Sequence, residues 1–195
     1  MLSSRSFHCL TLDSFLDWIP MLTYFRLFFD ICLFRQPAEN VPKSETLLLL
    51  TLGTAIASGA FNALADYRMS GALFMAAIQV LLFALMIWIA LRLRGHQERW
   101  IQTTTGIYGA ITILQIITIP LSSWHSRLMS PDISGVVLTL PLLTIAGISI
   151  WTLAVTASVL RQAMQIPISA AVLIIIGSQA LLLMIVFKVI TSVGY

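Results

Sequence analysis

The chain has 195 residues, of which 58% are hydrophobic and only 10% are charged. Because an ordinary soluble domain is about 25% charged, this composition predicts that lipid surrounds most of the chain and leaves no room for a separate soluble domain. The formal net charge of +3 would suggest nucleic acid in a soluble protein, but here the basic residues flank apolar runs, where they set membrane topology and meet lipid headgroups, so no nucleic-acid partner is expected.

Residues 1–46 form the only extended region rich in polar side chains, and we predict a cytosolic or interfacial N-terminal segment there. Within it, residues 15–34 alternate aromatic side chains with charges such as Arg26 and Asp30 too often for a membrane span. The apolar residues recur at helical spacing, at positions 18, 21, 22, 25, 28, 29 and 32. This pattern predicts an amphipathic helix in the headgroup plane. A proline-containing connector follows, and Ser44 is placed to cap the next helix.

Residues 47–195 predict a transmembrane domain of about five helices, since each apolar run approaches the roughly 20 residues that a helix needs to cross a bilayer. The predicted spans cover residues 47–65, 72–91, 103–121, 134–160 and 169–190. We expect the third span to end near Pro120. Pro141 should kink the fourth unless neighbours satisfy the freed carbonyl. The predicted fold class is therefore an all-α polytopic membrane protein with an N-terminal interfacial helix.

Lysine and arginine are unequally divided between the two ends of the predicted bundle. Eight lie in the N-terminal region and in the loops after spans two and four, whereas three lie on the other side. The positive-inside rule therefore predicts a cytoplasmic N-terminus and a C-terminus outside. In the loop after span two, the candidates for lipid-headgroup binding are Arg92, Arg94 and Arg99.

Two kinds of residue inside the spans are candidates for contacts between helices. Small residues let helices approach closely, and the packing candidates are Gly53, Ala57, Gly59, Gly106 and Ala110. Uncharged polar residues form interhelical hydrogen bonds or, alternatively, line a path for a polar substrate. These candidates are Asn62, Gln79, Tyr108, Gln115 and Gln179.

Known catalytic and ligand-binding signatures do not occur in the sequence: it has no HExxH, CxxC, GxSxG, Walker or GxGxxG pattern. We therefore assign no catalytic, cofactor-binding or metal-binding residue and predict that the chain is not an enzyme. The enzymatic alternative would require the loop around His96, or His125 with Arg127 and Asp132, to converge on a pocket.

Three stretches carry a resemblance to a known family, together with the order of a cytosolic segment and five closely spaced spans. They read FRQPAENVPKSETLLLL, WIQTTTGIYGA and SIWTLAVTASVLRQAMQIPISAAVLIII. The chain resembles the Yip1 superfamily of five-span membrane proteins, particularly its small bacterial members. The resemblance implies membrane organisation without catalysis, here in a bacterial inner membrane. Eukaryotic relatives act with small GTPases, but the acidic, aromatic N-terminal motifs of those relatives are missing here, so no GTPase partner is expected.

Two functions from different classes remain. The leading hypothesis is a non-enzymatic membrane scaffold or accessory subunit that packs against lipid, other integral membrane proteins or a second copy of itself. The alternative is a small transporter or channel component with a polar path between helices. Polar side chains that converge on one cavity would favour transport, whereas side chains that pair between helices or face a neighbour would favour the scaffold.

Overall fold

The computed structural model describes residues 22–64, 68–128 and 139–193, without the side chains of residues 186, 187 and 189–193. Residues 22–32 form a first helix, and a short 3-10 turn follows at η1 (Ala38–Asn40). The long helices are α2 (Glu45–Ala63), α3 (Met69–Leu93), α4 (Trp100–Leu128), α5 (Leu140–Met164) and α6 (Ile168–Val193), with η2 (Gln97–Arg99) between α3 and α4. No strand occurs in these described ranges.

Each of the helices α2 to α6 provides a segment that is long and apolar enough to cross a membrane. The chain is therefore an integral membrane protein, and the predicted all-α polytopic fold is confirmed. The predicted cap of the first span is also confirmed, because the Ser44 hydroxyl accepts a hydrogen bond from the Leu47 N–H at 3.3 Å.

The two proline predictions are wrong. Helix α4 continues past Pro120 to Leu128, since a proline inside a membrane helix removes one backbone N–H without having to end the helix. Pro141 does not kink α5, because it lies in the first turn, after the cap Thr139, where its missing N–H would have no partner in any case. The predicted start of this span, residues 134–138, lies outside the described residues.

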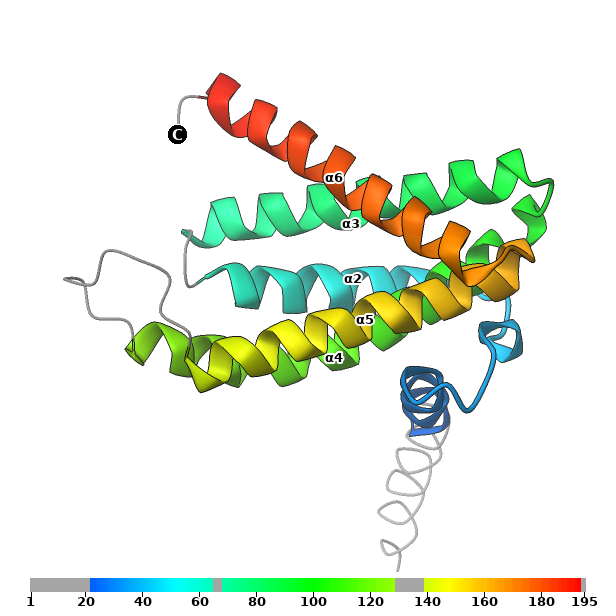
Figure 1. Ribbon diagram of the computed structural model, residues 1–195, viewed down its shortest axis with the longest axis horizontal. Coiled ribbons are helices and arrows are strands. Elements are labelled where there is room, and N and C mark those ends of the chain that lie inside the picture. The colour runs from blue at the N-terminus through cyan, green and yellow to red at the C-terminus, as the bar shows by residue number, and fades with distance from the viewer. Residues whose placement is uncertain (1–21, 65–67, 129–138, 194–195) are drawn as a thin grey trace, which may run out of the picture.

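Helix α4 is the centre of the bundle. It packs most extensively against α2 and α5, which run beside it in Figure 1, and it is the most buried of the five spans. Helix α6 follows a different course: it packs against the end of α5 where the two are joined, crosses α3 obliquely and then diverges from the bundle (Figure 1). Its outward face is consequently exposed along most of its described length.

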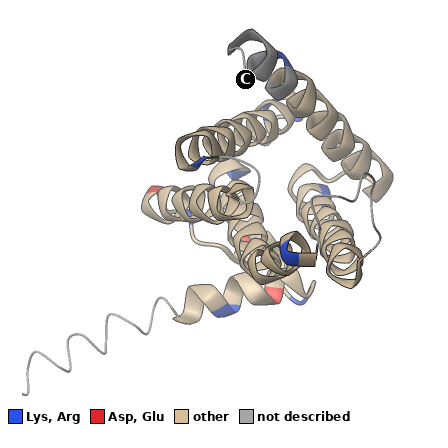
Figure 2. Cartoon of the chain, turned by 90° about the vertical axis from the view of Figure 1, so that its left-hand side faces the viewer, with Lys and Arg blue, Asp and Glu red and all other residues tan. Residues whose placement is uncertain are grey.

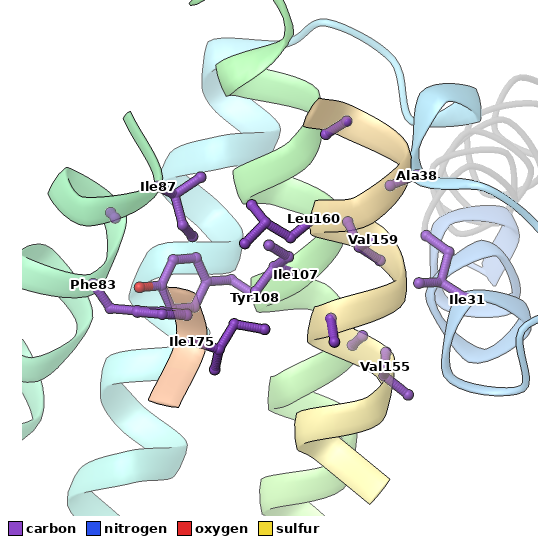
Figure 3. Close-up of a cluster of buried hydrophobic side chains, with 14 of the residues drawn as sticks. Ile31, Ala38, Phe83, Ile87, Ile107, Tyr108, Val155, Val159, Leu160 and Ile175 are labelled. Carbon is purple, nitrogen blue, oxygen red and sulfur yellow. The ribbon is translucent and has the colours of Figure 1, made fainter. Parts of the chain in front are cut away.

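A cluster of buried side chains from α3, α4, α5 and α6 surrounds Tyr108. Tyr108 of α4 points towards Phe83 and Ile87 of α3, with Leu160 of α5 and Ile175 of α6 close by (Figure 3). The Tyr108 hydroxyl donates to the Val80 carbonyl at 2.6 Å. A tyrosine hydroxyl is thus buried with its hydrogen bond made, which satisfies it in a dry core.

The first helix runs across the bundle and not along it, as Figures 1 and 2 both show. Ile31 and Cys32 are 2% and 3% exposed and Phe28 is also buried, whereas Leu22 and Phe25 are 72% and 57% exposed. The predicted apolar face therefore combined buried residues, such as Phe28 and Cys32, with exposed ones, such as Leu22 and Phe25. The helix has one apolar side against the protein and a second that faces away from it.

Candidate functional site

The first helix and η1 are seated on α4 through two glycines. The ring of Phe28 occupies the place where a side chain of Gly109 would lie, and a Cβ on Gly106 would come within 2.9 Å of the Cβ of Ala38. Both glycines and Ala110 are buried. The packing candidates Gly106 and Ala110 thus serve contact with the N-terminal segment within the same chain.

Helix α5 also contacts the end of the first helix, through Trp151. The indole N–H donates to the Cys32 carbonyl at 3.0 Å, and the ring packs edge-on against Phe34 with centroids 5.4 Å apart. Phe34 has a positive φ of 58°, which non-glycine residues seldom adopt. The carbonyl that ends the first helix is thereby satisfied, and the chain turns towards η1.

Polar contacts fasten the connector to the start of α4. Gln102 Nε2 donates to the Val41 carbonyl at 2.9 Å, and Arg99 pairs with Glu39 at 2.8 Å. Since that ion pair is partly exposed, it contributes at most about 1 kcal/mol. We name residues 22–43 the strap.

The strap also buries Cys32, whose thiol lies 3.5 Å from the Ala110 carbonyl. Burial raises the pKa of the Cys32 thiol to about 11, partly offset by a backbone hydrogen bond. A thiol that stays protonated is a poor nucleophile, so Cys32 is suited to packing and not to catalysis.

A polar cluster joins α2 to α4 near the ends opposite the α3–α4 loop. Asn62 Nδ2 donates to the carbonyls of Ser58 at 3.0 Å and Gln115 at 3.2 Å, and its Oδ1 lies 3.2 Å from the Thr118 hydroxyl. Gln115 Oε1 accepts from the Ser58 hydroxyl at 2.6 Å. Two of the five predicted polar candidates therefore pair with each other across a helix interface.

This cluster forms one side of an open groove of about 350 Å³. Gln115, Thr118 and Ser122 of α4 face Ser149 and Thr152 of α5 across it. Both α5 hydroxyls donate to carbonyls of their own helix at 2.9 and 2.8 Å. The α5 serine and threonine were not among the predicted candidates, because a hydroxyl in an apolar helix gives no signal of the direction in which it points.

The other polar candidates do not join the groove. Tyr108 is buried in the core described above, and Gln179 on α6 is half-buried. Gln79 on α3 is exposed, and within the described part of the chain its carboxamide has no hydrogen-bond partner. Gln79 lies ten residues after Met69, the first residue of α3. At 1.5 Å per residue this is about 15 Å along the helix, so Gln79 lies well inside a span.

The small residues of α2 divide between two faces. A Cβ on Gly59 would contact Ala76 of α3 at 3.5 Å, so this residue does serve helix packing within the chain. Gly53 and Ala57 are exposed, and a Cβ on Gly53 would have nothing within 4 Å. Within the described part of the chain, the Gly53/Ala57 pair is therefore exposed and not used in close helix packing, and its use in contact with another chain stays a prediction.

The basic candidates lie together at the end of α3 and the start of α4. Arg92 stacks over the Trp88 ring at 4.9 Å, Arg99 is paired with Glu39, and Arg94 is exposed at the α3 C-cap. Figure 2 shows Lys and Arg scattered among long stretches that carry no charge. Guanidinium groups in this position can bind the phosphates of lipid headgroups.

The residues required by the enzymatic alternative are not brought to a common pocket within the described chain. His125 Nδ1 shares a hydrogen bond of 2.7 Å with the Thr139 hydroxyl, and His96 lies 3.7 Å from Glu98 in an accessible loop. Asp132 lies outside the described residues. Across residues 22–64, 68–128 and 139–193, no group of three His, Cys, Asp or Glu side chains could hold a metal ion.

The fold and these contacts define a class, the polytopic α-helical membrane proteins. No family model, curated protein or solved structure matches this chain.

Proposed function

We propose that this chain is a non-enzymatic scaffold or accessory subunit that packs against other integral membrane proteins or a second copy of itself. The observation that carries the proposal is Gln79, an exposed carboxamide within a span and without a partner in the described chain. Hydrocarbon offers no hydrogen bond, so an unsatisfied amide there is costly. A polar group on a neighbouring helix would satisfy it.

The pairing of the other polar residues supports the same function. Asn62 and Gln115 bond each other across α2 and α4, and Tyr108 bonds the backbone of α3. Such pairing stabilises a bundle, whereas Gln79, well inside α3, faces outward. Interhelical hydrogen bonds of this kind contribute about 0.6 kcal/mol on average, enough to orient a partner helix that also packs well.

Site-directed cross-linking in native membranes tests the proposal. In a chain whose own cysteines are replaced by serine, the thiol of Gln79→Cys is labelled with a maleimide–benzophenone reagent, which on illumination inserts into C–H bonds of an adjacent chain and should therefore cross-link to a partner. Leu81→Cys and Leu85→Cys are matched controls, because both leucines are exposed on α3, at 57% and 46%, and lie on the side of the helix away from Gln79. Equal yields at all three positions, or adducts only at the leucines, would refute the proposed contact.

One observation favours transport as a second candidate function, namely the open groove between α4 and α5. Its hydroxyl and amide groups could bind an uncharged polar solute. Proteoliposomes in a glycerol gradient distinguish the two functions. Under the scaffold proposal they swell no faster than protein-free vesicles. Faster swelling that is lost in Ser149→Trp would favour a transporter or channel component.

The orientation, family and cellular location of the protein are proposed from sequence patterns. We propose a cytoplasmic N-terminus and an outside C-terminus from the unequal division of Lys and Arg. We also propose membership of the Yip1 superfamily and a bacterial inner membrane location, from the three resembling stretches. Parts of these stretches lie close together in the fold, because Phe34, Gln102 and Trp151 all contact the region where the strap meets α4 and α5.

A further inference from the structure

We propose that the open groove between α3 and α6 binds one anionic phospholipid of the bilayer, with an acyl chain along the groove and the headgroup phosphate on Arg94. The groove has a volume of about 420 Å³ and lies near the end of the bundle where α3 turns into the basic loop. Its α3 wall includes Met86 and Leu93, and its α6 wall includes Ile174 and Leu181.

The shape of the groove follows from α6. This helix crosses α3 obliquely (Figure 1), and Gly177 presents no side chain to the space between them: a Cβ there would have nothing within 4 Å. The groove is therefore an elongated apolar space open to the bilayer. An acyl chain, and not a compact polar solute, fits such a lining.

The charge at the mouth of the groove selects the headgroup. Ser178, the other polar residue of the lining, already donates to the Ile175 carbonyl at 2.8 Å. Arg99 is paired with Glu39, and Glu98 lies beside His96. Within the described chain, Arg94 has no carboxylate at ion-pair distance, so its guanidinium is available to an anion. A ligand with an aliphatic chain and an adjoining negative charge matches both features.

Native mass spectrometry of the full chain in mild detergent tests this site, with phosphatidylglycerol and phosphatidylcholine added in equal amounts. The unaltered protein should retain phosphatidylglycerol preferentially. Arg94→Gln should lower that retention several-fold, to the level of phosphatidylcholine. Arg68→Gln is the matched control, because Arg68 is an exposed arginine at the opposite end of α3, and it should leave the preference unchanged.

A second variant tests the groove independently of charge. Gly177→Leu should fill the groove and reduce retention of both lipids, whereas Gly147→Leu, on α5, introduces the same side chain where a Cβ also meets nothing within 4 Å and should have no effect. Circular dichroism checks that each variant is folded. The proposal is overturned if Arg94→Gln keeps the phosphatidylglycerol preference, or if Gly177→Leu retains as much lipid as Gly147→Leu.

Discussion

Gly109 has no side chain where the ring of Phe28 lies, and this single absence lets a helix that precedes the spans rest against the centre of the bundle. Gly106 does the same for Ala38 one turn earlier. From the sequence, Gly106 was a candidate for packing between helices, and Gly109 was not singled out. The contact of these glycines with the strap could not be predicted, because a glycine in a sequence does not indicate which residue packs against it.

Adding one methyl group at this contact should release the strap. In Gly109→Ala the new Cβ would overlap the Phe28 ring, so the first helix must move away from α4. We expect amide exchange in residues 22–32 to accelerate at least tenfold. Gly147→Ala, where the Cβ has open space, should leave that exchange unchanged; unaltered exchange in Gly109→Ala would contradict the packing described.

The seated strap should also set the chemistry of Cys32. An accessible thiol of ordinary pKa ionises around pH 9, but burial raises the pKa of Cys32 to about 11. In a Cys9→Ser chain, the rate of N-ethylmaleimide reaction should therefore be slow at pH 7 and still rising between pH 9 and pH 11, where an exposed thiol has levelled off. A plateau near pH 9 in the folded protein would show that the thiol is not buried.

At the scale of helices, local sequence patterns predicted which segments are helical but not how the helices pack against one another. Five apolar runs of the right length predicted five spans, and Ser44 predicted the start of α2. The predictions for Pro120 and Pro141 were wrong, because the effect of a proline depends on its position in the helix and on the structure around it. The buried face of the first helix was also missed, since the residues that cover it lie on α4 and α5, far along the sequence.

The contact between α2 and α4 depends on a small set of polar groups. Gln115→Leu removes the acceptor of the Ser58 hydroxyl but leaves that hydroxyl its bond to the Ala55 carbonyl at 3.2 Å. We therefore expect a loss of about 1 kcal/mol in unfolding free energy, measured by denaturant titration in mixed micelles. Gln179→Leu, which breaks no described hydrogen bond, is the control. A loss no larger than that of the control would mean that the cluster does not hold the helices together.

For the whole molecule, the composition sufficed to predict a helical membrane protein, because few charges and long apolar runs leave no other stable arrangement. The course of α6 and the two grooves could not be predicted. They depend on how far one apolar helix diverges from another, and the apolar residues of these helices do not indicate in the sequence which of them contact a neighbouring helix.

The orientation of the whole molecule can be measured directly. A reporter that is active only outside the cytosol, fused after Tyr195, should give signal because Lys and Arg are concentrated at the other end. The same reporter inserted after Gly95, in the basic loop, should be silent. Signal at the loop and silence at the C-terminus would invert the proposed topology.

The seat of the strap has a consequence for the order of events during synthesis. The first helix leaves the ribosome before the spans, and Trp151, which donates to the Cys32 carbonyl, lies 119 residues later in the chain. At translation speeds of roughly 5–20 residues per second, the strap must wait on the order of 6–24 seconds for its binding partner. During this interval its two apolar sides would keep the first helix on the membrane surface. It would then pack against α4 and α5 once these helices are inserted.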